Sequence, residues 1–164
     1  MRILCAIGSR RGTDVVRQLG EFAPAGAELV LLHVIDTGPR HDLDQLRGPM
    51  HPHHTHQADL NVAEEDAATG ALKEAAGEAA RRGLEVKERL ERGRPERLIV
   101  SVAAEIEADL VVLCARESAQ AHPRQGPPSV GHTARFVVDH APTPVLLLRE
   151  RGPLEPMPPH GPPA

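Results

Sequence analysis

The sequence predicts a three-layer α/β/α fold built on a parallel β-sheet. Short apolar runs recur along the chain, and most of them lack the alternation that is typical of a sheet with one exposed face. Segments with helical periodicity separate these runs. Buried strands that alternate with amphipathic helices require parallel strands with helices on both faces of the sheet. A chain of 164 residues without a visible internal repeat fits one such domain.

Each expected element follows from its local pattern. Strands are expected at apolar runs that end in turn residues, and these runs are residues 3–7, 27–35, 84–90, 108–115 and 141–150. Helices are expected where apolar residues recur every three or four positions, which happens in residues 13–22, 58–82, 95–106 and 130–140. Thr13 is a candidate cap for the first helix, and Phe22 and Val138 are expected to face the core. "LEVKERL" (84–90) alternates polar and apolar residues, which indicates a half-exposed edge strand.

The composition argues against several classes of function. With two Phe, no Tyr and no Trp, the chain lacks an aromatic platform on which single-stranded nucleic acid stacks. The formal net charge of -4 argues against a general nucleic-acid partner. No apolar run approaches the roughly 18 residues of a membrane span, and we expect no signal peptide. Cys5 and Cys114 are expected to be buried free thiols in a reducing cytoplasm.

Two segments stand outside this pattern. Residues 36–57 are polar and rich in Pro, Gly and His, so we expect a long loop inside a domain of residues 1–150. The loop contains a histidine cluster that is a weak candidate for a divalent metal: His51, His53, His54 and His56. Residues 151–164 carry six prolines and little periodic apolar pattern, so we expect a disordered tail.

Several segments together resemble the universal stress protein family. They are "LVLLHVID" (29–36), "GLEVKERLERGRPERLIVSVAAEIEADLVVL" (83–113) and "VGHTARFVVDHAPTPVLLLR" (130–149), and the resemblance covers roughly residues 1–150. It implies a five-stranded parallel sheet with the strand order 3-2-1-4-5, in the Rossmann-like class of adenine nucleotide alpha hydrolases. It also implies a regulatory protein of the stress response that acts without catalysis.

The chain departs from the ATP-binding pattern of this family. ATP-binding members carry Gly, two residues, Gly, nine residues, and then Gly-Ser or Gly-Thr after the fourth strand, because glycines let backbone amides approach phosphates. Here Cys114 and Glu117 take the two glycine positions, and thirteen residues separate Glu117 from Gly131. His132 stands where Ser or Thr is usual, and "CAIGS" lacks the Asp that commonly ends the first strand. We therefore expect weak or absent ATP binding and no required cofactor.

Some of the family's nucleotide-contacting positions remain recognisable. The resemblance assigns them to the ends of the first, second and fourth strands and to the start of the last helix: Ile7, Gly8, Ser9, Val34, Cys114, Arg116, Gly131, His132 and Thr133. A weak anion site at this helix start, with Ser129 as a candidate cap, stays open beside a simple capped helix. Arg10, Arg11, Arg116 and Arg124 are read as solvated loop residues rather than as ligands of an anion.

Three functions remain open from the sequence. The first is a non-enzymatic regulator, and the second is an ATP- or AMP-binding family member with a rebuilt phosphate loop. The third is a small hydrolase or a metal-handling protein, although no G-x-S-x-G elbow and no P-loop is present. His33 lies inside a buried strand and is expected to be a satisfied core residue rather than a base.

The last strand is expected to form a homodimer. Its apolar residues, Val145, Leu146, Leu147 and Leu148, meet no charge before Arg149. An apolar edge strand offers unpaired backbone groups to another strand. In this family the last strand commonly pairs across a two-fold axis, which closes the assembly at two copies. Other protein partners are expected but are not identified by the sequence.

Overall fold

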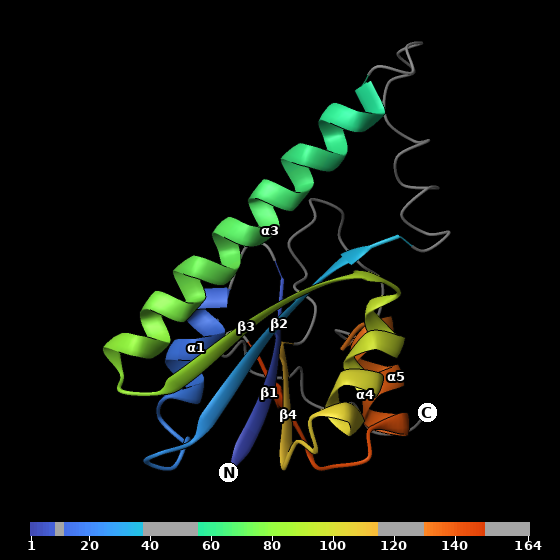
Figure 1. Ribbon diagram of the computed structural model, residues 1–164. Helices are drawn as coiled ribbons and strands as arrows, with labels where there is room; N and C mark the ends of the chain where they lie inside the picture. Colours follow the sequence, from blue (N-terminus) through green and yellow to red (C-terminus); the bar gives the residue numbers. More distant parts are fainter. Residues whose placement is uncertain (9–11, 38–55, 115–129, 150–164) are drawn as a thin grey trace, which may run out of the picture.

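A computed structural model describes residues 1–8, 12–37, 56–114 and 130–149, with the side chains of residues 56–60 excepted. Five strands form one parallel sheet in the order β3-β2-β1-β4-β5, as the resemblance implies (Figure 1). The strands are β1 (Arg2–Ile7), β2 (Glu28–Asp36), β3 (Glu85–Gly93), β4 (Leu110–Cys114) and β5 (Val145–Leu148). The described helices are α1 (Gly12–Leu19), α3 (His56–Arg81), α4 (Pro95–Glu105) and α5 (His132–His140).

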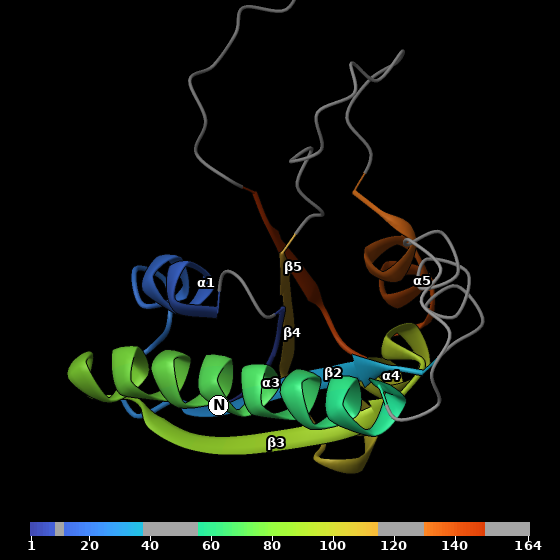
Figure 2. The ribbon, with the colours of Figure 1, turned by 90° about the horizontal axis from the view of Figure 1, so that it is seen from above.

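Helices cover both faces of the sheet, with α1 and α3 on one side and α4 and α5 on the other (Figure 2). Alternate residues of the strands supply the two cores. Leu29 and Leu31 of β2 pack with the α1/α3 layer, whereas Val30 and Leu32 pack with the α4/α5 layer. Both layers rest on aliphatic side chains, as expected of a parallel sheet that is buried on both faces.

Three local expectations are wrong. α1 begins at Gly12, so Thr13 lies inside the helix and does not cap it. Phe22 lies beyond the end of α1, where the chain turns toward β2, and it is 64% exposed. Val138 of α5 is 54% exposed because the short helix turns Ala134 and Val137 inward and leaves its neighbour in solvent. In each case helical spacing was correct as a pattern, but the length or rotation of the helix decided which residue was covered.

The long helix α3 packs tightly against α1 through small residues. Ala71 and Ala75 are buried, and a Cβ added to Gly12 would lie only 2.9 Å from Ile7 Cδ1 and 3.1 Å from Ala75 Cβ. The glycine therefore permits the close approach of α1 to both the sheet and α3. The N-terminal part of α3 extends past the sheet (Figure 1), and Ala63 and Ala67 are exposed there.

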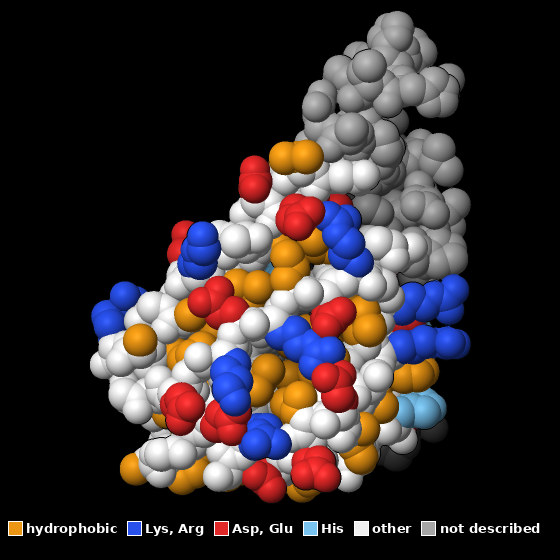
Figure 3. Space-filling view, viewed as in Figure 1, with side chains coloured by type: hydrophobic (Ala, Val, Ile, Leu, Met, Phe, Trp, Pro, Cys, Tyr) orange, Lys and Arg blue, Asp and Glu red, His pale blue; other side chains and the backbone are white. Residues whose placement is uncertain are grey.

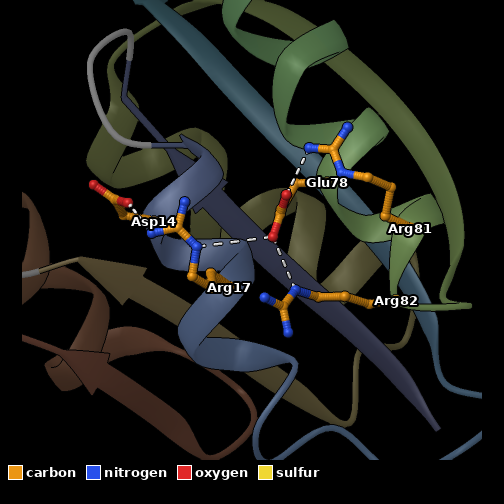
Figure 4. A network of polar contacts seen from close by, with 5 residues as sticks. All are labelled: Asp14, Arg17, Glu78, Arg81 and Arg82. Carbon is orange, nitrogen blue, oxygen red and sulfur yellow. Dashed lines mark hydrogen bonds and ion pairs between the residues drawn. The ribbon is translucent and has the colours of Figure 1, made fainter.

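An ionic cluster joins the same two helices at their surface (Figure 4). The Glu78 carboxylate of α3 accepts from Arg81 Nη2 at 2.6 Å and from Arg82 Nε at 3.0 Å. Arg17 Nε of α1 approaches the same carboxylate to 3.8 Å, and Arg17 Nη1 donates to Asp14 at 2.9 Å. The hydrogen bonds from Arg81 and then Arg82 lower the pKa of Glu78. Glu78 thus stays ionised and links α3 to α1.

The two edges of the sheet differ in chemistry. β3 is the predicted edge strand, and acidic and basic side chains are interspersed over the face that it forms with α3 (Figure 3). The charged residues of β3 are Glu85, Lys87, Glu88, Arg89, Glu91 and Arg92. β5 forms the opposite edge with apolar residues alone, and Val145, Leu146 and Leu147 are half-buried while Leu148 is buried.

The bounds of the predicted His-rich loop overlap two observed elements. β2 continues through Asp36, and α3 begins at His56, so the ends of the 36–57 segment belong to a strand and a helix. Residues 38–55, and the tail that is expected to be disordered at 151–164, lie outside the described residues.

Candidate functional site

The candidate site lies at the carboxyl ends of β1 and β4, where the strand order reverses. Parallel α/β sheets bind ligands in the crevice at this position, because the connections leave the two central strands toward opposite faces. β1 pairs with both β2 and β4, and from β1 the chain leads to α1 on one face. After β4 the next described helix is α5, which lies on the other face. The ends of β1 and β4 are Ile7 and Cys114.

The end of β1 has an open backbone position. Ile7 is buried at 6% exposure and packs into the α1/α3 core, whereas Gly8 is exposed. A Cβ added to Gly8 would meet nothing within 4 Å, so packing alone does not require glycine there. Ser9, Arg10 and Arg11 lie outside the described residues.

The predicted contact residues of β2 and β4 lie on opposite faces of the sheet. Val34 packs against the α4/α5 core, and Cys114 packs against the α1/α3 core. Cys5 lies on the same face as Cys114, and the two thiols form no disulfide. Cys5 is buried as expected, whereas Cys114 is only half-buried. Burial, and to a lesser degree the neighbouring Cys114, raise the pKa of Cys5 to about 12. Cys5 is therefore a protonated core residue and no nucleophile.

The N-cap residue of α5 is a glycine. Gly131 is the residue that caps the helix N-terminus, and its φ of 91° is a conformation that side-chain-bearing residues rarely adopt. Glycine has no side chain with which to cap the helix itself. His132 is exposed and Thr133 is half-buried in the first turn. Ser129, Arg116, Glu117 and Arg124 lie outside the described residues, so the structure does not address their expected roles.

A carboxylate that the sequence did not indicate lies beside this helix start. Glu96 Oε1 of α4 is 3.9 Å from His132 Nε2, and the Glu96 side chain is only 16% exposed. Glu96 is the second residue of α4, after Pro95. In sequence it is a common acidic residue in the first turn of a helix, where it complements the helix dipole. Only the packing of α4 on α5 brings it to His132.

His33 is buried, as predicted, at 5% exposure, but only part of its imidazole has a partner. The ring hydrogen-bonds to the backbone of Ile7, whereas Nδ1 has no hydrogen-bond partner in the described part of the chain. Burial lowers the pKa of His33, while Glu64 on α3 and the Ile7 backbone oppose this shift. The neutral imidazole is thus held near the end of β2, on the face that α3 covers.

The structure gives no support to a metal centre among the residues that it describes. These residues contain no group of three or more His, Cys, Asp or Glu that could hold a metal ion. His51, His53 and His54 lie outside the described residues, and the side chain of His56 is not described although its backbone begins α3. The metal hypothesis for this cluster therefore stays a prediction.

A second hollow lies at the opposite, amino-terminal end of the sheet. It has a volume of about 340 Å³ and is lined by Arg2, Glu28, Val30, Lys87, Glu88, Arg89 and Ile106. Its cations are already engaged, since Glu28 accepts from Arg2 at 3.1 Å and from Lys87 at 2.6 Å. An anion entering this hollow would compete with carboxylates that are in place.

The geometry defines a class of protein: a doubly wound α/β domain whose crevice lies at the switch point of a five-stranded sheet. The universal stress protein family matches residues 1–149, and the chain belongs to this family. No match was found among curated proteins. No helix within the described ranges is long and apolar enough to cross a membrane.

Solved structures share this fold over nearly their whole length. The universal stress protein UspA from Lactobacillus plantarum is 25% identical with a TM-score of 0.64, covering 91% of this chain and 97% of that chain. A family member from Burkholderia pseudomallei is 27% identical with a TM-score of 0.59, covering 90% and 94%. A family protein from Arabidopsis thaliana with AMP bound is 13% identical with a TM-score of 0.59, covering 91% of each chain, and this likeness shows the fold alone.

Proposed function

We propose that this chain is a non-enzymatic regulatory protein of the stress response that binds ATP weakly or not at all. It acts through protein contacts as a homodimer. The observation that carries the proposal is the Glu96 carboxylate at 3.9 Å from His132, at the helix start where a phosphate chain is expected to bind in this family. Membership of the universal stress protein family supports the regulatory role.

Charge at the helix start opposes a triphosphate. An N-terminus of a helix favours anions because its backbone amides and its dipole present positive charge. A carboxylate at about 4 Å from a phosphate oxygen is worth about 4 kcal/mol of repulsion near a protein surface, which exceeds the dipole's contribution. Cys114 replaces a loop glycine at the end of β4, and its side chain hinders the close approach of backbone amides to a phosphate. These features together favour weak ATP binding.

A ligand with a short phosphate chain is the second candidate. The Arabidopsis neighbour was solved with AMP bound. Among the described residues, none comes within 4 Å of a Cβ added to Gly8 at the end of β1, and the residue at the start of α5 is also a glycine, Gly131. AMP carries less negative charge toward Glu96 than ATP does, so it suffers less repulsion. A nucleotide-binding member with a rebuilt phosphate loop would therefore prefer AMP to ATP.

A small hydrolase or metal-handling protein is the third candidate. Turnover that requires an added divalent metal would favour it over the other two. The histidine cluster of the 36–57 segment is the feature on which it rests, and this cluster has no Cys or carboxylate at a convincing spacing.

The lack of Tyr and Trp makes a retained nucleotide easy to detect in the purified protein. Without Tyr or Trp, the purified protein absorbs little near 280 nm, so a retained nucleotide dominates the ultraviolet spectrum at 260 nm. Mass spectrometry of the released ligand then identifies it. We expect no ATP to be retained and no heat of binding when ATP is titrated at micromolar concentrations. A micromolar dissociation constant for ATP would overturn the proposal, and retained AMP would replace it with the second candidate.

The proposed dimer forms through β5. Its apolar residues form an edge of the sheet, whereas the other edge, β3, is blunted by charge. Val111 N donates to Pro144 O at 3.0 Å, and alternate residues of a parallel strand direct their backbone groups to the same neighbour. The backbone groups of Val145 and Leu147 therefore point away from β4, toward the open edge. The same strand of a second copy would satisfy them in a closed, self-complementary contact.

The proposal also covers the extent of the domain, its cellular location and its class of partner. The family match over residues 1–149 supports one domain of residues 1–150. Cys5 and Cys114 form no disulfide, which favours a cytoplasmic location, where disulfides are rare. The net charge of -4 favours protein partners over nucleic acid.

A further inference from the structure

His33 is a buried polar side chain whose ring is only partly hydrogen-bonded. It projects from β2 on the face that α3 covers, because it alternates with Val34, which packs on the other face. His33 is 5% exposed, and its Nδ1 has no hydrogen-bond partner in the described part of the chain. Leaving a buried polar atom without a partner is unfavourable, and few such atoms occur in folded proteins. An apolar side chain would avoid this cost, so core packing alone does not account for a histidine here.

The surroundings of the ring suit its neutral form. The bond to the Ile7 backbone favours the protonated ring, which means that the ring donates to the Ile7 carbonyl and that Nδ1 carries a lone pair. Protonation would create a second N–H at Nδ1, where the described residues offer no acceptor, and would bring a positive charge into the interior. Burial is the largest influence on the ring and lowers the pKa of His33. The protonated ring is therefore more stable in water than under α3.

The charged groups around His33 do not offset its burial. The elements beside it on this face are α3, β1 and β3. Glu64 of α3 favours the protonated ring, but its influence is smaller than that of burial. On β1 the titratable residue of this face is Cys5, which stays protonated. β3 places Glu88 and Arg92 on this face, at either side of the position opposite His33, and both are exposed, so that water and salt screen them.

The C-terminal section of α3, residues 72–81, is held firmly to the domain. It supplies the residues of α3 that pack in the α1/α3 core, which are Leu72, Ala75, Ala76 and Ala79. Its Glu78 also approaches Arg17 of α1 at 3.8 Å. Both apolar packing and an ionic contact therefore fix this section against the sheet and α1.

The N-terminal section of α3, residues 61–71, is attached more weakly. It supplies no residue to the α1/α3 core, and most of its side chains are exposed. Glu64 and Ala68 are one turn apart on the same side of the helix, and Ala68 is buried. The ion pair of Glu65 with Arg92 joins two exposed side chains, and such pairs contribute little. This section can therefore leave the sheet at a smaller cost than the C-terminal section.

We infer that His33 makes the attachment of α3 sensitive to pH: the neutral ring lets the N-terminal section lie on β2, and protonation separates this section from the sheet while the C-terminal section stays in place. Separation brings water to Nδ1 and to the new charge. Acid therefore favours the open form, and neutral pH favours the closed form. His33 lies opposite Ile7 in the sheet, so the movement takes place beside the candidate site at the end of β1. This device works whether or not the domain binds a nucleotide.

A purely structural role for His33 makes a different prediction. A histidine that only resists protonation lowers the stability of the whole domain in acid, because the unfolded chain binds the proton more readily. All parts of the core then become easier to open by the same factor. Separation of the N-terminal section alone is a local opening, which exposes little surface and depends only weakly on urea. Local amide exchange therefore distinguishes the two roles, and a melting temperature does not.

The test follows backbone amide exchange by NMR, residue by residue, in the wild type, His33→Gln, His33→Leu and the control His140→Gln. His33→Gln keeps a donor for the Ile7 carbonyl and cannot be protonated, and His140 is exposed on α5. The exchange is compared at about pH 7.5 and about pH 5.5, one unit on either side of the ordinary histidine pKa of 6.5. In the wild type, exchange of residues 61–71 should accelerate in acid by up to about tenfold after correction for the intrinsic effect of pH. The acceleration should be absent from both His33 variants and retained in His140→Gln.

Three results would overturn the inference. One is unchanged protection of residues 61–71 in the wild type across this pH range. Another is an acceleration that persists in His33→Gln and His33→Leu, because it would then come from another group. The third is an equal acceleration in residues 72–81 or a strong dependence on urea, since the domain would then open as a whole. Circular dichroism checks that each variant is folded.

Discussion

Arg89 in β3 and Glu105 in α4 are joined by two parallel hydrogen bonds, each 2.8 Å long, between one guanidinium and one carboxylate. Arg89 Nε also donates to Glu91 at 2.6 Å, so the arginine holds two carboxylates at once. This bidentate ion pair connects the edge strand β3 to α4, the helix that follows it along the chain. Arg89 lowers the pKa of Glu105, which shows that the ionised form is the one that the folded protein prefers.

We expect Glu105→Gln to lower the melting temperature slightly at neutral pH and to have no effect in acid. The pKa of Glu105 is lowered from 4.5 by folding, so its stabilisation is present above that value and disappears as the pH falls through the lower value of the folded state. The effect is small because the Glu105 side chain is 58% exposed. Thermal unfolding followed by circular dichroism at neutral and acid pH measures it. Glu74→Gln on the exposed face of α3 serves as the control, and an equal loss at both pH values would contradict the ion pair.

Gly12→Ala and Gly70→Ala should change stability in opposite directions. The new methyl group at Gly12 would lie 2.9 Å from Ile7 Cδ1, and such overpacking costs about 1–3 kcal/mol. At Gly70 an added Cβ meets nothing within 4 Å, so alanine should stabilise α3 by about 0.5–1 kcal/mol through its helix propensity. Urea unfolding at constant pH measures both. If Gly12→Ala proved neutral, the close packing of α1 described here would be wrong.

His33→Leu should make the stability of the protein less dependent on pH. Burial lowers the pKa of His33 below 6.5, so the folded state binds fewer protons than the unfolded state. The wild type therefore has its full stability above pH 6.5 and loses it as the pH falls from 6.5 toward the folded value, by at most about 1.4 kcal/mol per pH unit.

Urea midpoints at a series of pH values between about 5 and 8 give this slope. The groups that face His33 are Glu64 on α3, which opposes the shift, and the backbone of Ile7 on β1. Arg92 of β3 lies nearby on the same face and is paired with Glu65 at 2.5 Å. His140→Gln, at an exposed position, is the control. Identical slopes for the wild type and His33→Leu would show that the buried imidazole does not resist protonation.

Leu147→Lys should dissociate the proposed dimer or cause it to aggregate. Light scattering of the wild type at tens of micromolar should give twice the 17.7 kDa mass of one chain. The variant brings a charge to the strand edge, and charge at an edge blocks pairing with another strand. Leu147 also packs partly against the α4/α5 core, so Leu147→Met is the matched control, and circular dichroism must show that both variants are folded. A wild-type mass equal to that of one chain would contradict the proposed dimer.

The sequence predicted the layers of the fold but not the rotation of its helices. The continuous apolar run 27–35 indicated a strand covered on both faces, and β2 is such a strand. The alternation of residues 84–90 indicated an edge, and β3 forms one. Phe22 and Val138 were placed inside because apolar spacing was counted, whereas the ends and the tilt of short helices depend on contacts with distant residues.

The sequence indicated where the site lies but not all of the residues that form it. Gly131 and His132 were found because the resemblance to the universal stress protein family assigns them to the end of its glycine motif. Glu96 was missed because it comes from a different helix. The sequence "RPERL" gives no signal that distinguishes a carboxylate directed against α5 from a carboxylate exposed to water. The unpartnered Nδ1 of His33 was missed for a related reason, since burial is visible in a sequence pattern but hydrogen-bond geometry is not.

The close approach at Gly12 has a mechanical consequence for the whole domain. α1 approaches Ile7 and Ala75 at this residue, and its Arg17 approaches Glu78, one turn further along α3. These two contacts connect α1 both to the central strand and to α3. A larger side chain at residue 12 would therefore displace α1 from the central strand and from α3 at the same time.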